Sequence, residues 1–125
     1  MKFALLTHDL MIVPRVDGIV RDLNCSLEQV FSLENLQSSW KELPADVVLI
    51  DLMLPGLDIE CVASWIRSQG TNVTLIAFVP HVHTQKIKLA QDVGCDQVYA
   101  RGEFLSQIRA IISQCSGNHQ QDPLA

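Results

Sequence analysis

The sequence predicts a single α/β domain in which five strand–helix units build a parallel sheet with helices on both faces. Short apolar runs alternate along the chain with segments whose apolar residues recur at helical spacing. One run, Val47 to Ile50, is entirely β-branched or aliphatic, which is typical of a strand buried on both faces. The length of 125 residues, with 48% hydrophobic residues, suits one domain with its own core.

The first half of the chain contains three expected strands and two expected helices. The expected elements are a strand at 2–6, a helix at 12–23, a strand at 27–32, a helix at 33–43 and a strand at 47–50. Pro44 ends the second helix, because the residue before a proline disfavours helical geometry. Asp51 directly follows the third strand, and the turn-forming Leu54-Pro55-Gly56 comes next.

The second half repeats the alternation. We expect a helix at 59–66 that Gly70 ends, a strand at 73–79 that Pro80 ends, a helix from Thr84 to Gly94, a strand at 97–100 and a last helix at 104–112. Thr84 is the expected cap of its helix. Residues 1–115 then form the domain, and the polar residues 116–125 form a flexible C-terminal tail.

Composition excludes several classes of function. The formal charge is −5 and the nine Lys and Arg residues are scattered, so we expect no nucleic-acid partner. The longest apolar stretches, 45–57 and 73–82, are interrupted and shorter than the ~20 residues of a membrane span. Without a signal peptide at its start, the chain is expected in the cytoplasm. The four cysteines are far apart in sequence and are expected to be free thiols.

In a parallel α/β sheet, functional residues gather beyond the carboxyl ends of the strands. In this chain those positions are Thr7-His8-Asp9, Asp51, residues 79–83 and Arg101. An aspartate directly after a buried strand is costly unless solvent, a metal or hydrogen-bond donors meet its charge. Asp51 is therefore either a structural or a reactive residue.

The segment from Val47 to Asp58 resembles the third strand and following loop of response-regulator receiver domains, and residues 2–9 and 94–101 resemble other parts of the same family. The resemblance implies a flavodoxin-like (βα)5 fold with strand order 2-1-3-4-5, and it puts Asp51 at the phosphoacceptor position. The acidic pair that holds Mg²⁺ in that family falls on Thr7 and His8, with Asp9 one residue further on. The hydroxyl position falls on Val79, and the lysine position falls on Arg101.

These replacements favour a stand-alone atypical receiver, or pseudo-receiver, that acts through protein–protein interaction. We expect no enzymatic activity, no cofactor and no complete Mg²⁺ site, because Thr7 and His8 lack the hard anionic oxygens that Mg²⁺ prefers. Two arrangements of Asp51 stay open: a permanent pair with Arg101, or phosphorylation by an unusual route. The family resemblance implies a histidine kinase or a downstream signalling protein as partner.

Two further hypotheses come from the strand ends and from the second half of the chain. A small flavodoxin-like protein that binds a ligand or a transition metal is one alternative, and the candidate metal ligands are His8, Asp9, His81 and His83. A contact surface, which could also form a homodimer, is expected on the helix at 84–94, the strand at 97–100 and the last helix. Basic residues of this part of the chain would suit an acidic partner; they are Lys86, Lys88, Arg101 and Arg109.

Overall fold

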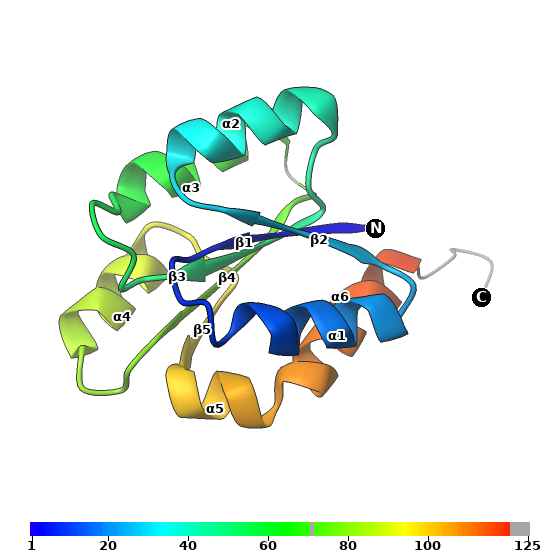
Figure 1. Cartoon of the computed structure of the whole chain (residues 1–125). Coiled ribbons are helices and arrows are strands. Elements are labelled where there is room, and N and C mark those ends of the chain that lie inside the picture. The colour runs from blue at the N-terminus through cyan, green and yellow to red at the C-terminus, as the bar shows by residue number, and fades with distance from the viewer. Residues whose placement is uncertain (71, 121–125) are drawn as a thin grey trace.

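The computed structural model describes residues 1–70 and 72–120 and confirms the expected α/β class (Figure 1). Five parallel strands form one sheet in the order β2-β1-β3-β4-β5, the order that the family resemblance implies. The strands are β1 (Lys2–Leu6), β2 (Ser26–Val30), β3 (Val47–Asp51), β4 (Thr74–Val79) and β5 (Gln97–Ala100). The helices are α1 (Val13–Asp22), α2 (Leu33–Glu42), α3 (Ile59–Gln69), α4 (Thr84–Asp92), α5 (Arg101–Ser106) and α6 (Ile108–Gln120).

Helices cover both faces of the sheet, and each face has its own hydrophobic core. Figure 1 shows α2 and α3 on one side of the sheet and α1, α5 and α6 on the other. Alternate residues of β1 enter different cores, because successive side chains of a strand point to opposite faces. Ala4 and Leu6 pack with α2, α3 and α4, whereas Phe3 and Leu5 pack with α1, α5 and α6.

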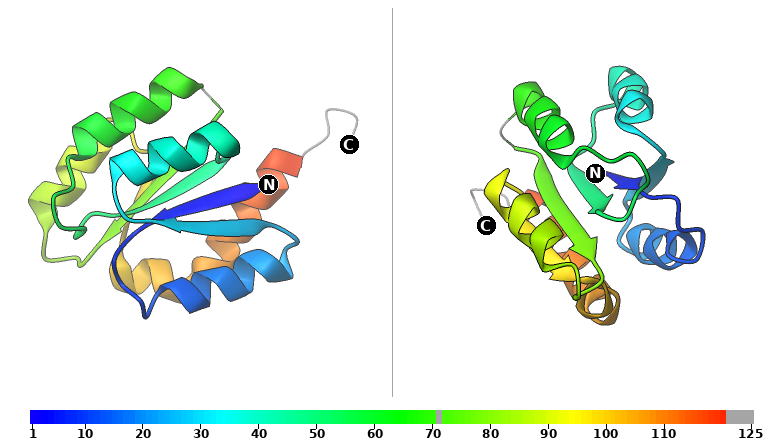
Figure 2. Two further views of the ribbon diagram at one scale, coloured as in Figure 1. Left: turned by 45° about the horizontal axis from the view of Figure 1, so that its top comes forward. Right: turned by 90° about the vertical axis from the view of Figure 1, so that its left-hand side faces the viewer.

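The central strand β3 is buried along its whole length, as its apolar sequence predicts. It pairs with β1 on one side and with β4 on the other. Since all five strands are parallel, their carboxyl ends lie at one edge of the sheet, onto which the right panel of Figure 2 looks. Asp51 ends β3 at this edge, which we call the carboxyl edge.

Local sequence explains where several helices begin. Pro14 lies in the first turn of α1, where a missing backbone N–H costs nothing. The side chains of Ser32 and Asp58 cap α2 and α3 by accepting backbone N–H bonds from Asn35 and Cys61. The expected cap at Thr84 is wrong, because a turn in which the His83 N–H donates to the Pro80 carbonyl makes His83 the N-cap and Thr84 the first helical residue.

The end of the chain differs most from the sequence-based expectation. The expected last helix is two helices, α5 and α6, because the backbone of Gln107 leaves helical values with φ −113° and ψ 12°. Phe104 in α5 stacks on Phe78, and Ile108 in α6 packs in the same core, so both helices stay on the sheet. Helix α6 continues to Gln120, beyond the expected domain boundary at residue 115, and residues 121–125 of the expected tail lie outside the described residues.

Two expectations from composition concern the membrane and the thiols. Among residues 1–70 and 72–120, no helix is long and apolar enough to cross a membrane. All four cysteines are free, as expected.

Candidate functional site

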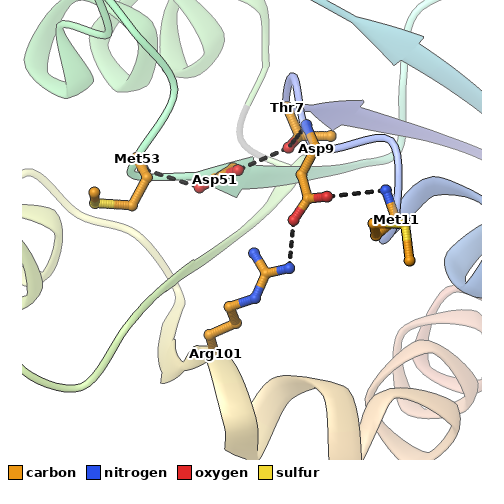
Figure 3. A network of polar contacts seen from close by, with 6 residues as sticks. All are labelled: Thr7, Asp9, Met11, Asp51, Met53 and Arg101. Carbon is orange, nitrogen blue, oxygen red and sulfur yellow. Dashed lines mark hydrogen bonds and ion pairs between the residues drawn. The ribbon is translucent and has the colours of Figure 1, made fainter.

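Asp51 is held at the carboxyl edge by hydrogen bonds to both of its carboxylate oxygens (Figure 3). The Thr7 hydroxyl donates to Oδ2 at 2.7 Å, and the backbone N–H of Met53 donates to Oδ1 at 2.9 Å. The side chain is buried, with 6% of its surface exposed. A buried carboxylate needs such donors, because it has lost most of its hydration. The contacts tie the end of β3 to the end of β1 and to the loop that follows Asp51.

Thr7 lies opposite Asp51 because of the strand register. β1 and β3 are parallel neighbours, and Leu6 pairs with Ile50. Thr7 follows Leu6 and Asp51 follows Ile50, so these two residues lie side by side. Thr7 is completely buried, and its hydroxyl oxygen also accepts the backbone N–H of Asp9 at 3.0 Å. One hydroxyl therefore satisfies both the Asp51 carboxylate and the start of the β1–α1 loop.

Asp9 forms the ion pair of this site. Its Oδ1 accepts the backbone N–H of Met11 at 2.9 Å, and its Oδ2 accepts a charge-assisted hydrogen bond from Nη2 of Arg101. The Arg101 bond, supported by the Met11 N–H, holds the pKa of the Asp9 carboxyl below its ordinary value. Arg101 is the first residue of α5, so the pair joins the loop after β1 to the helix after β5.

Of the two arrangements left open for Asp51, the permanent pair with Arg101 does not form. Arg101 donates to Asp9, and the oxygens of Asp51 are bonded to Thr7 and Met53 (Figure 3). The physical reason is that each charged group has a hydrogen-bond partner nearer than the other group. Asp51 is buried beside a hydroxyl and a backbone donor, whereas Asp9 is partly exposed and can meet the long side chain of Arg101.

The other expected neighbours of Asp51 have ordinary roles. His8 is exposed, its Nε2 lies 3.2 Å from the Phe31 carbonyl oxygen, and its ring lies 5.6 Å from that of Phe31. Val79, at the position where a hydroxyl was missing, is completely buried at the end of β4 and belongs to the core that contains α2, α3 and α4.

The candidate transition-metal site of His8, Asp9, His81 and His83 does not assemble. Among the described residues, no group of three or more His, Cys, Asp or Glu side chains is placed to hold a metal ion. The carboxylate of Asp9 is already bonded to Arg101. His81 is exposed, and His83 is the N-cap of α4.

The residues at this edge also do not fit a magnesium site. Mg²⁺ needs hard oxygen ligands that can turn toward it. The carboxylates nearest the end of β3, those of Asp9 and Asp51, are both engaged by donors of the protein. The guanidinium of Arg101 binds the Asp9 carboxylate, and the neutral hydroxyl of Thr7 binds the Asp51 carboxylate.

The basic character expected for the second half of the chain is reduced by ion pairing. Arg101 pairs with Asp9, and Arg109 pairs with Asp22 at 2.9 Å. Lys86 and Lys88 remain as exposed basic residues of α4. Half of the four cations are therefore neutralised within the chain.

Sequence reasoning named Thr7 as a lost metal ligand and missed its role as a hydrogen-bond donor. The sequence contained a signal for this role, because the first and third strands of a 2-1-3-4-5 sheet are neighbours. The residues that end these strands, Thr7 and Asp51, are then expected to lie close together. The donor role of the Met53 N–H carried no sequence signal, because it depends on the path of the backbone after Asp51.

Comparison with solved structures shows that the chain has the fold of response-regulator receiver domains. A two-component response regulator from Clostridium difficile superimposes with a TM-score of 0.81, covering 97% of this chain and 99% of its own, at 15% identity. The receiver domain of the Francisella response regulator 1452 superimposes with a TM-score of 0.76, covering 95% of this chain and 98% of its own, at 16% identity. The receiver domain of the sensor histidine kinase PA1611 from Pseudomonas aeruginosa has a magnesium ion in its active-site cleft. It superimposes with a TM-score of 0.75, covering 93% of this chain and 97% of its own, at 19% identity.

No protein-family model matches the sequence, and no curated protein matches it significantly. At these low identities the structural likeness establishes the fold.

Proposed function

We propose that this chain is an atypical receiver-like signalling domain that acts through contact with another protein and does not use Asp51 as a phosphoacceptor. The observation that carries the proposal is the internal pairing of the site. Asp51 is bonded to Thr7 and Met53, and Arg101 is bonded to Asp9. Each charged group that could take part in phosphoryl transfer therefore has a partner within the chain.

Phosphoryl transfer depends on positive charge placed where the transferred group sits. At this edge the charge of Arg101 is balanced by Asp9, and Thr7 and His8 stand where the family resemblance would put the acidic pair. A phosphoryl group on Asp51 would have to displace the Thr7 or Met53 donor and draw Arg101 away from Asp9. Losing hydrogen bonds to charged groups costs about 1.5–3 kcal/mol each, which opposes the modification.

The proposal includes no cofactor, no Mg²⁺ and no enzymatic activity. At the carboxyl edge Asp9, Asp51 and Arg101 are engaged by contacts within the chain, and this arrangement supports a role in binding rather than in chemistry. We place the chain in the cytoplasm, with a histidine kinase or a downstream signalling protein as the partner. The alternative partner is a second copy of the chain, bound through α4, β5, α5 and the start of α6, and sedimentation would test it.

The test compares the natural chain with the Asp51→Asn variant. Both are incubated with acetyl phosphate, with and without Mg²⁺, and their intact masses are measured. A receiver domain that is known to accept phosphate is treated in parallel to verify the donor. We expect neither form of this chain to gain the mass of a phosphate, and we expect Mg²⁺ to release no measurable heat on titration into the protein.

A stable gain of one phosphate by the natural chain but not by Asp51→Asn would overturn the proposal. It would favour the alternative, a phosphorylatable response regulator with an altered site. In that case the structure of the modified protein should show Arg101 bonded to the phosphoryl group, because a dianion competes better than Asp9 for a guanidinium.

A further inference from the structure

The two tryptophans of this chain form a pair that bridges α2 and α3. Trp40 belongs to α2 and Trp65 to α3, and these helices lie side by side in both views of Figure 2, in cyan and green. The ring centroids are 5.2 Å apart and the rings are inclined at 80°, an edge-to-face contact. Both side chains are partly buried and pack on the core under α2 and α3. Each ring therefore has one side on the core and another at the surface.

A cavity of about 620 Å³ lies beside this pair, between the two helices. We call it the α2–α3 cavity. Apart from Trp40 and Trp65, every residue that lines it has a polar or charged side chain; these residues are Glu34, Gln37, Ser38, Lys41 and Gln69. Ligand-binding pockets commonly have volumes of roughly 300–1,000 Å³ and combine aromatic walls with a few polar groups. The α2–α3 cavity has this size and this lining.

The polar groups of the cavity are not used by the fold. Within residues 1–70 and 72–120, the four polar lining residues of α2 make no side-chain hydrogen bond or ion pair. Neither indole N–H donates to that part of the chain, and no buried side-chain nitrogen there lacks a partner, so both N–H groups are open to solvent. At the carboxyl edge, by contrast, the charged groups are engaged within the chain. The donors and acceptors of the cavity are therefore free to bind a ligand.

The angle between the rings limits the shape of that ligand. A planar aromatic ligand is commonly held between two parallel rings, and an edge-to-face pair leaves no parallel slot. A sugar ring has faces of C–H groups, which pack on the electron-rich face of a single indole. Its hydroxyl groups both donate and accept hydrogen bonds, as the mixed set of amide, hydroxyl, carboxylate and ammonium groups in the cavity requires.

The charges of the cavity also favour a neutral ligand. Glu34 contributes one negative charge and Lys41 one positive charge, so the lining has no formal net charge. A ligand with either charge would be repelled by one of these two groups, whereas a neutral ligand can accept a hydrogen bond from Lys41 and donate one to Glu34.

We propose that the α2–α3 cavity is a binding site for a neutral saccharide, which packs on the Trp40–Trp65 pair and hydrogen-bonds to the polar lining residues. The cavity shares no residue with the network of Thr7, Asp9, Asp51 and Arg101. The inference is therefore independent of the proposed function, and either one can fail alone.

The test uses tryptophan fluorescence, because both tryptophans of the chain line the cavity and no other residue contributes to the signal. The full chain is titrated with four neutral disaccharides: maltose, cellobiose, lactose and N,N′-diacetylchitobiose. Glucose 6-phosphate and adenosine represent charged and planar aromatic ligands. We expect at least one disaccharide to change the fluorescence saturably with a Kd of about 1 mM or less, and the two comparison ligands to bind at least about tenfold more weakly.

A double variant and a matched control decide whether the cavity is responsible. Gln37→Ala with Lys41→Ala removes two polar groups of the lining, keeps both tryptophans and should weaken binding about tenfold or more. Gln91→Ala with Lys88→Ala makes the same change in composition and charge on exposed positions of α4 and should leave binding unchanged. Circular dichroism of both variants verifies that they are folded.

Three outcomes would overturn the inference. The first is the absence of a saturable response to all four disaccharides. The second is binding of adenosine or glucose 6-phosphate as tight as that of the best disaccharide. The third is an equal loss of binding in the two double variants, which would place the ligand elsewhere. A gain of phosphate on Asp51 would overturn the proposed function and would leave these readouts unchanged.

Discussion

Replacing Thr7 by valine tests the central hydrogen bond of the site. Valine has nearly the shape of threonine, so the change removes the hydroxyl and leaves the packing of this buried position in place. The Thr7 hydroxyl donates to the buried Asp51 carboxylate at 2.7 Å and accepts the Asp9 N–H at 3.0 Å. Without it, one oxygen of a buried carboxylate loses its donor.

The magnitude follows from the charge and the burial of Asp51. A hydrogen bond to a charged group contributes about 1.5–3 kcal/mol, whereas one between neutral groups contributes about 1 kcal/mol. We expect Thr7→Val to lower the free energy of unfolding by about 2 kcal/mol. In the Asp51→Asn background the acceptor is neutral, so the same substitution should cost only about 1 kcal/mol. Thr7→Ser keeps the hydroxyl and should cost about 1 kcal/mol for the lost methyl group.

Urea unfolding at pH 7, followed by circular dichroism, measures all four proteins of the double-mutant cycle. A loss of 2 kcal/mol should lower the urea midpoint of Thr7→Val by about 1 M or more. The reasoning is refuted if Thr7→Val costs less than about 0.5 kcal/mol, or if its cost is equal with Asp51 and with Asn at position 51.

Two further predictions concern Asp9 and Asp58. Because Arg101 lowers the pKa of Asp9 from 3.8, the pair stabilises the fold above about pH 4 and loses its effect as the pH falls through the lowered pKa. Asp9→Asn should lower the free energy of unfolding at pH 7 by about 0.5–1 kcal/mol, and its difference from the natural chain should vanish in acid. As a control, Asp22→Asn removes a more exposed ion pair and should lower the free energy of unfolding less. An equal effect of the two substitutions would contradict the assignment. The Asp58 carboxylate raises the pKa of the exposed Cys61 thiol, so Asp58→Asn, which keeps a capping side chain, should react faster with a thiol reagent such as DTNB at pH 8. An unchanged rate would mean that the carboxylate does not govern the thiol.

The fold was predictable because its signals are local and repeat. Strands β1, β3 and β4 are short apolar runs with clear ends, and the β3 run is apolar enough to require burial on both faces. The break at Gln107 was not predictable from spacing, because Phe104, Ile108 and Ile111 keep a helical spacing across it and enter one core. A pattern that reports which residues are buried does not report whether the backbone between them is continuous.

The candidate site was predictable in its membership and not in its pairing. Thr7, Asp9, Asp51 and Arg101 were all identified, because each lies at a strand end of one parallel sheet. Which carboxylate pairs with Arg101 depends on the length and the exposure of the side chains in the fold, and the sequence pattern predicts neither. A resemblance that placed Arg101 near the acceptor favoured Asp51, whereas the geometry gives Arg101 to Asp9.

The replacements at this edge are mutually consistent when they are considered as one electrostatic unit. A carboxylate at position 7 or 8 would add negative charge beside Asp51 and would require a cation from solvent. Thr7 instead meets Asp51 as a neutral donor, and the remaining carboxylate, Asp9, stands where Arg101 can reach it. Among the described residues, no buried side-chain nitrogen or oxygen lacks a hydrogen-bond partner. The charged side chains of Asp9, Asp51 and Arg101 are therefore satisfied by donors and acceptors of the chain itself.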